Sequence, residues 1–460
     1  MRETVVKPGE EIELNIEAIN HQGQGVGRFK GMAVFVSAVV PGETVIARVT
    51  ELKKSYALAQ RVEILAASEN RVQPRCQLFN TCGGSHLQHI EYGLQLELKR
   101  TLVEDSLKRI GKLTGVIVQP TIGMPDPWGY RNKATFQVNL ADDKIKLGFF
   151  EEGSHDLVPA AQCLLLDRQI RDVANIVEGL LEKYRIPVYD WQTGSGLIRH
   201  VVIRKSWHSQ KIMVVLVTSP EKSQELAALA REIRLLDPAI VSVVHNVNPG
   251  RGRQVFGSAS QVLDGQNYIT DQISELNFNI SPTSFFQVNS LQTEVLYDKA
   301  LEYAALIGTE TVLDVYCGIG TISLFLAQKA GRVYGFEVSA EAVEDAAANA
   351  RANHIANVEF IAGKAEERLP RLVSQGVHPD VVVVDPPRQG IEKRALQAIA
   401  DMAPIRIVYI SCDPGTMARD VSFLSNGGYK VEAVQPVDMF PQTSHVESIV
   451  LMTNSGLKGK

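Results

Sequence analysis

Residues 311–321 read TVLDVYCGIGT, a short apolar run followed by a loop that contains two glycines. Gly318 and Gly320 let the backbone turn tightly and approach a ligand closely. Glu337 ends the next apolar run, where an acidic side chain can accept hydrogen bonds from both hydroxyls of a ribose. The stretch therefore predicts a strand, a loop and a helix that bind a nucleoside-containing cofactor.

Apolar runs alternate with helical stretches through the rest of the chain. The runs cover residues 311–315, 332–336, 358–361, 381–384 and 405–410. Continuous apolar strands are typical of a parallel sheet with both faces covered. We therefore expect a Rossmann-like, doubly wound α/β domain over residues 276–460, with its ligand at the carboxyl ends of the strands.

A dinucleotide cofactor and a purely structural glycine turn are the alternatives for the glycine loop. Dinucleotide-binding loops prefer a third glycine, and this chain has Ser323 at that position. The strand, loop, helix and acidic residue together favour a cofactor with a single nucleoside.

Two further loops follow strands of this predicted sheet. Asp385-Pro386-Pro387-Arg388 ends the fourth run, and its prolines keep the loop rigid so that Asp385 points into the cofactor crevice. Ser411-Cys412-Asp413-Pro414 follows the fifth run. A thiol at the carboxyl end of a buried strand predicts a nucleophile, although a cysteine there can also be an inert core residue.

The remaining sequence predicts two other domains, because 460 residues exceed what one core usually holds. Residues 11–64 alternate apolar and polar over short runs separated by glycines, which indicates a small antiparallel barrel in a domain of residues 1–66. Residues 67–275 combine a helical pattern over 93–110 with strand-like runs such as 134–140 and 212–217. They predict a central α+β domain.

Composition describes an ordinary folded chain, with 45% hydrophobic and 22% charged residues. No uninterrupted apolar run is long enough to span a bilayer, and Met1 to Thr4 begin no apolar leader, so we expect a cytoplasmic protein without membrane contact. Five cysteines in this context are expected to be reduced. The net charge of −5 argues against nucleic acid only weakly, because the location of charge matters more than its total.

The motifs in this order resemble the RNA 5-methyluridine methyltransferase family, which uses S-adenosylmethionine. The N-terminal barrel resembles a TRAM domain, which points to the branch that acts on 23S ribosomal RNA. The resemblance rests on residues 284–289, 314–320, 385–388, 411–420 and 445–447. It implies that ribosomal RNA is the partner, with no obligatory protein partner, and that the cofactor contacts are Gln287, Tyr316, Glu337 and Asp385. Tyr316 has packing as its alternative role.

The resemblance also implies a covalent mechanism. C5 of uracil is too weak a nucleophile to take a methyl group unaided, so the thiolate of Cys412 would first add to C6. Glu447 would then remove the C5 proton so that the cysteine can leave. In amino-group methyltransferases an aromatic residue usually stands where this chain has Arg388, which disfavours attack by an exocyclic amine.

RNA binding is expected to involve extrusion of the target base into a pocket beside the cysteine. The barrel and the basic stretch near Arg131 and Lys133 would hold the flanking strand through phosphates and stacking. Arg199 and Arg204 are further candidates. Solvation is the alternative explanation for each single basic residue.

Cys76, Cys82 and Cys163 look like the family's four-cysteine iron–sulfur ligand set with Ser85 in the remaining position. Iron–sulfur clusters normally take four thiolates, and a serine oxygen is a harder, rarer ligand. Three interpretations stay open: a labile cluster, a zinc site that recruits His86 or His89, and a lost site whose cysteines pack. The last of these is preferred.

The leading functional hypothesis is therefore methylation of C5 of uridine in 23S ribosomal RNA. The same chemistry on transfer RNA is one alternative, and an RNA-binding assembly factor without catalysis is another. The presence of both Cys412 and Glu447 argues against the inactive factor.

Overall fold

A computed structural model of the chain describes residues 5–141, 143–151, 154, 156–159, 162–221, 223–252 and 254–457. Met1 to Thr4, which entered the prediction of location, lie outside these residues. Among the helices of the described part, none is long and apolar enough to cross a membrane.

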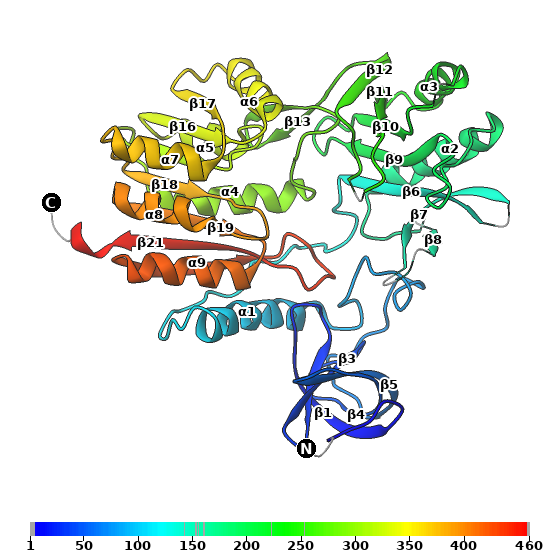
Figure 1. The fold of residues 1–460 in the computed structure, drawn as a ribbon, viewed down its shortest axis with the longest axis horizontal. Helices are drawn as coiled ribbons and strands as arrows, with labels where there is room; N and C mark the ends of the chain where they lie inside the picture. Colours follow the sequence, from blue (N-terminus) through cyan, green and yellow to red (C-terminus); the bar gives the residue numbers. More distant parts are fainter. Residues whose placement is uncertain are drawn as a thin grey trace.

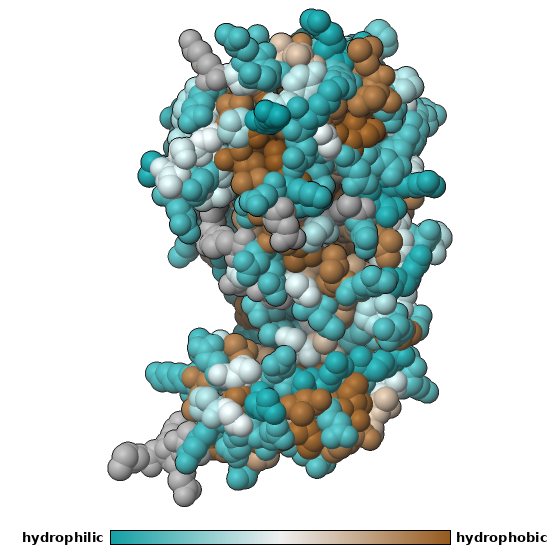
Figure 2. All heavy atoms as spheres, turned by 90° about the vertical axis from the view of Figure 1, so that its right-hand side faces the viewer, coloured by the Kyte–Doolittle hydropathy of each residue, from teal (hydrophilic) through white to brown (hydrophobic). Residues whose placement is uncertain are grey.

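The N-terminal strands close into a five-stranded barrel, which Figure 1 shows at the bottom of the molecule. Alternate side chains of β1 are buried, and the valines and isoleucines of the strands fill the interior. Figure 2 shows hydrophobic side chains on the outside of this part as well. The predicted barrel is confirmed, but it is not antiparallel throughout, because β3 and β5 pair in parallel. Its strands, in spatial order, are β1 (Glu11–Ile19), β2 (Gly25–Phe29), β3 (Met32–Ser37), β5 (Tyr56–Ala66) and β4 (Thr44–Leu52).

Helix α1 (Tyr92–Arg109) lies between the barrel and the C-terminal sheet (Figure 1). Val103 and Leu107 pack in the core that contains Met417 of α9 (Pro414–Asn426). Gly111 follows the helix at a close approach, because a Cβ there would lie 2.9 Å from the backbone oxygen of Ala418. The helix predicted over 93–110 thus packs against the C-terminal domain.

The central region forms a seven-stranded sheet, at the right of Figure 1. Every residue of β9 and β10 is buried, because helices α2 (Arg168–Lys183) and α3 (Glu225–Leu236) cover one face while the hairpin of β13 (Ile269–Ile273) and β14 (Leu276–Ile280) packs on the other. The predicted α+β region is confirmed. The strand order is β12 (Ala259–Gly265), β11 (Ile240–Val247), β10 (Ile212–Thr218), β9 (Ile198–Lys205), β6 (Lys133–Ala141), β7 (Lys144–Phe150) and β8 (Leu157–Pro159).

The C-terminal sheet, at the left of Figure 1, has helices on both faces, as the sequence predicts. Five neighbouring strands of this sheet, β17, β16, β15, β18 and β19, run parallel to one another. Strand β21 is antiparallel to both of its neighbours, β19 and β20. The strand order is β17 (Val358–Ala362), β16 (Arg332–Glu337), β15 (Thr311–Val315), β18 (Val381–Val384), β19 (Arg406–Ser411), β21 (Glu447–Asn454) and β20 (Tyr429–Val437). The helices are α4 (Ser290–Ala304), α5 (Thr321–Ala327) and α6 (Ala340–Ala352) on one face, and α7 (Ala365–Ser374), α8 (Lys393–Met402) and α9 on the other.

Candidate active site

Cys412 lies between the end of β19 and the start of α9, at the carboxyl edge of the parallel strands. Asp413 caps α9, because its carboxylate accepts a hydrogen bond from the backbone N–H of Thr416 at 2.8 Å. The thiol therefore sits just before a helix N-terminus, where the helix dipole favours a negative charge. The residue is partly buried.

The antiparallel strand β21 brings Glu447 to the same edge. Ser411 pairs with Ser448 across the two strands, so Cys412 and Glu447 are the next neighbours at the end of this ladder. Glu447 is only 4% exposed, and its Oε2 atom has no hydrogen-bond partner among the described residues. A nucleophile candidate and a base candidate thus meet from two neighbouring strands.

The charges at this edge raise each other's pKa values. Burial raises the pKa of the Cys412 thiol to about 12, and the Glu447 and Asp385 carboxylates act in the same direction while Arg388 opposes them. Burial and then the charge of Asp385 raise the pKa of Glu447 well above its usual range. Burial also raises the pKa of Asp385 to about 6. The site therefore holds a neutral thiol near pH 7, and an ionised Cys412 depends on Arg388 and the helix end.

The loop after Asp385 is fastened to α9. The hydroxyl of Thr416 donates to the backbone oxygen of Arg388 at 3.0 Å. Asp420, which is fully buried, accepts 2.7 Å hydrogen bonds from the N–H of Ile391 and the hydroxyl of Tyr409. These contacts fasten the loop to α9, and Asp385 and Arg388 lie close enough to Cys412 to influence the pKa of its thiol.

The glycine loop has the backbone shape that a close ligand requires. Tyr316, Gly318 and Gly320 have φ values of 73°, 55° and 83°. A Cβ at Gly320 would lie 2.8 Å from the ring of Phe360, whereas nothing lies within 4 Å of a Cβ built on Gly318. The space above Gly318 is thus open to a ligand.

Two carboxylates lie near the glycine loop, Glu337 at Gly318 and the buried Asp314 at the end of β15. Glu337 accepts hydrogen bonds from the backbone N–H groups of Gly318 at 3.2 Å and Ser339 at 2.9 Å, which fixes its orientation at the end of β16. Asp314 is buried, and burial raises its pKa to about 7. Ser323 donates to one oxygen of Asp314 at 2.5 Å, while Oδ1 has no partner among the described residues. Asp314 is a site residue that the sequence pattern did not single out, although it stands in the glycine motif.

Gln287 is buried in the segment before α4. Its backbone oxygen accepts a hydrogen bond from the side chain of Asn132 at 2.9 Å, which links it to the central sheet. Phe285 in the same segment is 64% exposed. Its ring is thus an exposed aromatic surface two residues before Gln287.

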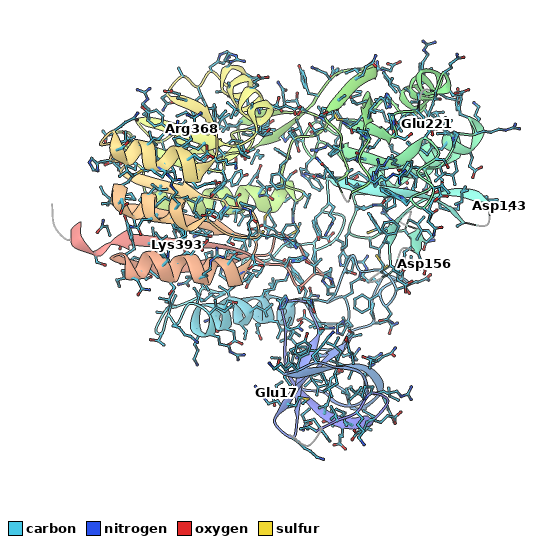
Figure 3. The ribbon with its side chains drawn as sticks, in the orientation of Figure 1. Glu17, Asp143, Asp156, Glu221, Arg368 and Lys393 are labelled. Carbon is cyan, nitrogen blue, oxygen red and sulfur yellow. The ribbon has the colours of Figure 1, made fainter. Side chains whose placement is uncertain are left out.

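Tyr316 faces a cavity of about 600 Å³ between the loop after Asp385 and helices α8 and α9. Other lining residues are Pro387, Arg419 and Lys393, the last of which is labelled in Figure 3 beside α8. Cys412, Glu337 and Gln287 do not line this cavity. Of the four predicted cofactor contacts, Tyr316 therefore faces a different space from the glycine loop.

Cys76, Cys82 and Cys163 lie in one region. After burial, the nearby thiols Cys163 and Cys76 help to raise the pKa of Cys82, and Cys76 helps to raise that of Cys163. All five cysteines are free, and the described residues include no group of three side chains poised to hold a metal ion. The side chain of Gln88 joins the segments around Cys76 and Ser85. It accepts a hydrogen bond from the N–H of Cys76 at 3.1 Å and donates one to the Ser85 hydroxyl at 2.7 Å.

The two histidines named for a zinc site are turned to other partners. A ring nitrogen of His89 lies 3.0 Å from the backbone oxygen of Val39, and His86 lies beside Ser444 and His445. Three cysteines and Ser85 do not fit a cluster that takes four thiolates.

The prediction that Arg199 and Arg204 contact RNA is wrong, because these residues are buried. They are only 1% and 3% exposed. The guanidinium of Arg199 lies 4.6 Å from the rings of both Tyr189 and Trp191 and donates to backbone oxygens. Arg204 donates to the backbone oxygen of Ser284 at 2.6 Å. Arg199 thus links β9 to the segment after β11, and Arg204 links β9 to the segment before α4.

Comparison with protein families matches residues 91–455 to the family described as tRNA (uracil-5-)-methyltransferase. The chain belongs to this family. Residues 5–62 match the TRAM domain, in agreement with the five-stranded barrel. As a member of the family, the chain is an S-adenosylmethionine-dependent RNA methyltransferase.

The relatives of this RNA methyltransferase extend over its whole length. It is 45% identical to an uncharacterized RNA methyltransferase of Halalkalibacterium halodurans over 97% of this chain and 98% of the relative. It is 46% identical to another uncharacterized RNA methyltransferase, of Caldanaerobacter subterraneus, over 97% of this chain and 99% of the relative. A crystal structure of Pyrococcus abyssi tRNA (uracil-54, C5)-methyltransferase with S-adenosyl-L-homocysteine is similar with a TM-score of 0.76 and 27% identity, covering 96% of this chain and 100% of that chain.

Proposed function

We propose that this RNA methyltransferase modifies C5 of uridine in 23S ribosomal RNA through a covalent bond between Cys412 and C6. The observation that supports the proposal is the strand register, which sets Cys412 beside the buried Glu447 at the carboxyl edge of the sheet. The three-domain division at residues 66 and 275 and a cytoplasmic location belong to the same proposal.

The chemistry starts at the Cys412 sulfur. Arg388 and the N-terminal end of α9 favour the thiolate, which adds to C6 of the extruded uracil and makes C5 nucleophilic. Bound S-adenosylmethionine supplies the methyl group from its sulfonium sulfur. Glu447 then takes the proton from C5, the C5–C6 double bond re-forms, and the C6–S bond breaks to release the thiolate.

The residues around the glycine loop fit the cofactor. Open space above Gly318, the carboxylate of Glu337 and the partnerless Oδ1 of Asp314 suit a ligand with a ribose and an ammonium group. Gln287 and Asp385 would contact the same ligand from the facing loops. Tyr316 lines a different cavity, which favours packing, its alternative role.

Glu337→Ala is expected to weaken binding of S-adenosylmethionine by about 10- to 100-fold, because hydrogen bonds to a charged carboxylate are lost. Isothermal titration calorimetry with the cofactor measures this effect. Glu359→Ala is the matched control, since Glu359 also lies on the sheet, is about half exposed and pairs with Arg332. Equal affinities of wild type and Glu337→Ala would remove Glu337 from the cofactor site.

The pH dependence of kcat/KM follows from the raised thiol pKa. Burial, with the nearby carboxylates of Glu447 and Asp385, raises the pKa of Cys412 to about 12, while Arg388 opposes the shift. The reactive thiolate fraction therefore grows as pH rises, and kcat/KM should increase by up to about tenfold per pH unit, the limit for one ionisation, from pH 7 to pH 8.5. Steady-state kinetics over this range, with circular dichroism as a control for folding, tests the expectation. A flat profile would mean that the thiolate is already formed at pH 7.

Transfer RNA is the second candidate substrate, and the similarity to the Pyrococcus abyssi enzyme favours it. That match covers 96% of this chain, so the barrel alone does not separate the two substrates. Incubation of the protein and labelled S-adenosylmethionine with 23S ribosomal RNA or with total transfer RNA, both transcribed without modifications, distinguishes them. Label in 5-methyluridine of the ribosomal RNA supports the proposal. Label only in transfer RNA means that transfer RNA is the substrate. Label in neither RNA supports the inactive assembly factor.

A further inference from the structure

The loop between β20 and β21, residues 438–446, leads directly into Glu447. Val437, which ends β20, pairs with Glu447 across the two strands. Asp438 directly follows Val437 in the chain, so it lies close to Glu447 across the two strands. Figure 1 shows the loop before β21 reaching toward the region where α1 and the central sheet approach each other.

At least one carboxylate oxygen of Glu447 is not held by any donor among the described residues. Its Oε2 is buried without a hydrogen-bond partner among the described residues. A carboxylate that must approach a carbon-bound proton benefits from this freedom, because a strong donor would lower its basicity. The direction of the side chain then depends on how firmly the backbone on either side is held.

A buried ion pair holds that backbone. The Lys99 ammonium group lies 2.5 Å from Oδ1 of Asp438, and both side chains are fully buried. Lys99 also donates to the backbone oxygen of Phe440 at 3.1 Å. The hydroxyl of Tyr92 donates to the other oxygen of Asp438 at 2.9 Å. Helix α1 thus provides the donors for the carboxylate of Asp438.

Such a pair contributes little to stability, because taking two charges out of water costs about as much as their attraction returns. A fully buried lysine is also rare in proteins. Its value lies in a fixed geometry, since the short, charge-assisted hydrogen bond sets the place of Asp438 relative to α1.

Other parts of the chain hold the middle of the loop. The backbone oxygen of Gln442 accepts from the N–H groups of His86 and Leu87, both at 3.0 Å. Asn289 donates to the oxygen of Met439, and Tyr130 donates to that of Pro441, both at 3.1 Å. The segment after the barrel, the central region and the start of α4 therefore all meet at this loop.

We infer that Lys99 and Asp438 are positioning residues that aim Glu447 at the reacting carbon. The inference rests on the proposed role of Glu447 as the base. If it holds, disturbing the pair slows the removal of the C5 proton more than the steps before it, because those steps depend on Cys412 and the cofactor loop on other strands.

The test uses the full-length double variant Lys99→Met/Asp438→Asn, which removes both charges and keeps the approximate shapes. In single-turnover reactions with the RNA substrate, formation of the protein–RNA adduct should stay within about threefold of wild type. Its resolution should slow about 10- to 100-fold, because small displacements of a catalytic group have effects of this size. Denaturing gels with labelled RNA would then show an accumulating methylated adduct.

The chain offers a matched control in the pair of Lys205 and Asp167, which lie 2.6 Å apart and are largely buried in the central region. Lys205→Met/Asp167→Asn should resolve the adduct at the wild-type rate. The milder Tyr92→Phe variant removes one hydrogen bond to Asp438 and should slow resolution about threefold. If the double variant does not fold, the rate at which Tyr92→Phe resolves the adduct tests the inference.

Two outcomes would overturn the inference. One is a folded double variant, or Tyr92→Phe where the double variant does not fold, that resolves the adduct as fast as wild type. The other is an equal slowing of adduct formation and resolution, which indicates a general structural role. Failure of the proposed base looks different, because Glu447→Gln itself would then accumulate no adduct.

Discussion

The Cys412→Ala variant is expected to lose methyl transfer by at least about four orders of magnitude, a loss typical of removing a catalytic nucleophile. Without the sulfur, C6 of uracil receives no nucleophile and C5 stays unreactive. The cofactor loop lies on β15 and β16, two and three strands away from β19, so binding of S-adenosylmethionine should change less than about threefold. Incorporation of labelled methyl groups into RNA and calorimetric titration with the cofactor measure both quantities.

Cys412→Ser is the companion to this variant. Its hydroxyl has nearly the size of the thiol but is a much weaker nucleophile, so it should be as inactive as alanine. Thermal melts followed by circular dichroism establish that both variants are folded. Turnover at more than about a tenth of the wild-type rate in either folded variant would exclude Cys412 as the nucleophile.

The Glu447→Gln variant is expected to accumulate a methylated covalent adduct with RNA. An amide has nearly the same shape as the carboxylate but does not take a proton, so the adduct forms and its C5 proton stays in place. Steady-state turnover should fall by about two to four orders of magnitude, the usual contribution of a general base. Denaturing gels with labelled RNA detect the slowly migrating species.

Glu302→Gln is the control for this substitution, because Glu302 lies on α4 with its side chain 62% exposed. It should form and resolve the adduct as the wild type does. If Glu447→Gln is folded, binds the cofactor and yields neither an adduct nor a loss of turnover, another group removes the proton.

The sequence predicted the parallel part of the catalytic sheet closely, because buried parallel strands are continuous apolar runs. Strands β15 and β18 cover residues 311–315 and 381–384, as predicted. Strands β16 and β17 end one residue later than predicted, and β19 is shifted by one residue. Each candidate at the catalytic edge follows directly from one of these strands. Cys412 comes one residue after β19, and Asp385 comes one residue after β18.

The antiparallel direction of β21 was not predictable from local sequence, because an apolar strand reads alike in either direction. Yet this direction brings Glu447, at the start of its strand, to the edge where Cys412 ends another. The location of Lys99 was not predictable from local sequence either. Lys99 stands in a stretch that has the composition of a solvated face, but the structure buries it completely against Asp438, 339 residues away. Such long-range partners leave no local pattern.

The identity of the residue bonded to the pyrimidine tests the central claim most directly. RNA substrate that contains 5-fluorouridine can accept the nucleophile and the methyl group, but a base cannot remove fluorine as it removes a proton, so the adduct persists in the wild-type protein. Digestion of this adduct and tandem mass spectrometry locate the bond. We expect one crosslinked peptide, with a methylated fluoropyrimidine on the sulfur of Cys412. A bond to any other side chain, or a methyl group on a nitrogen or a ribose, would contradict the mechanism.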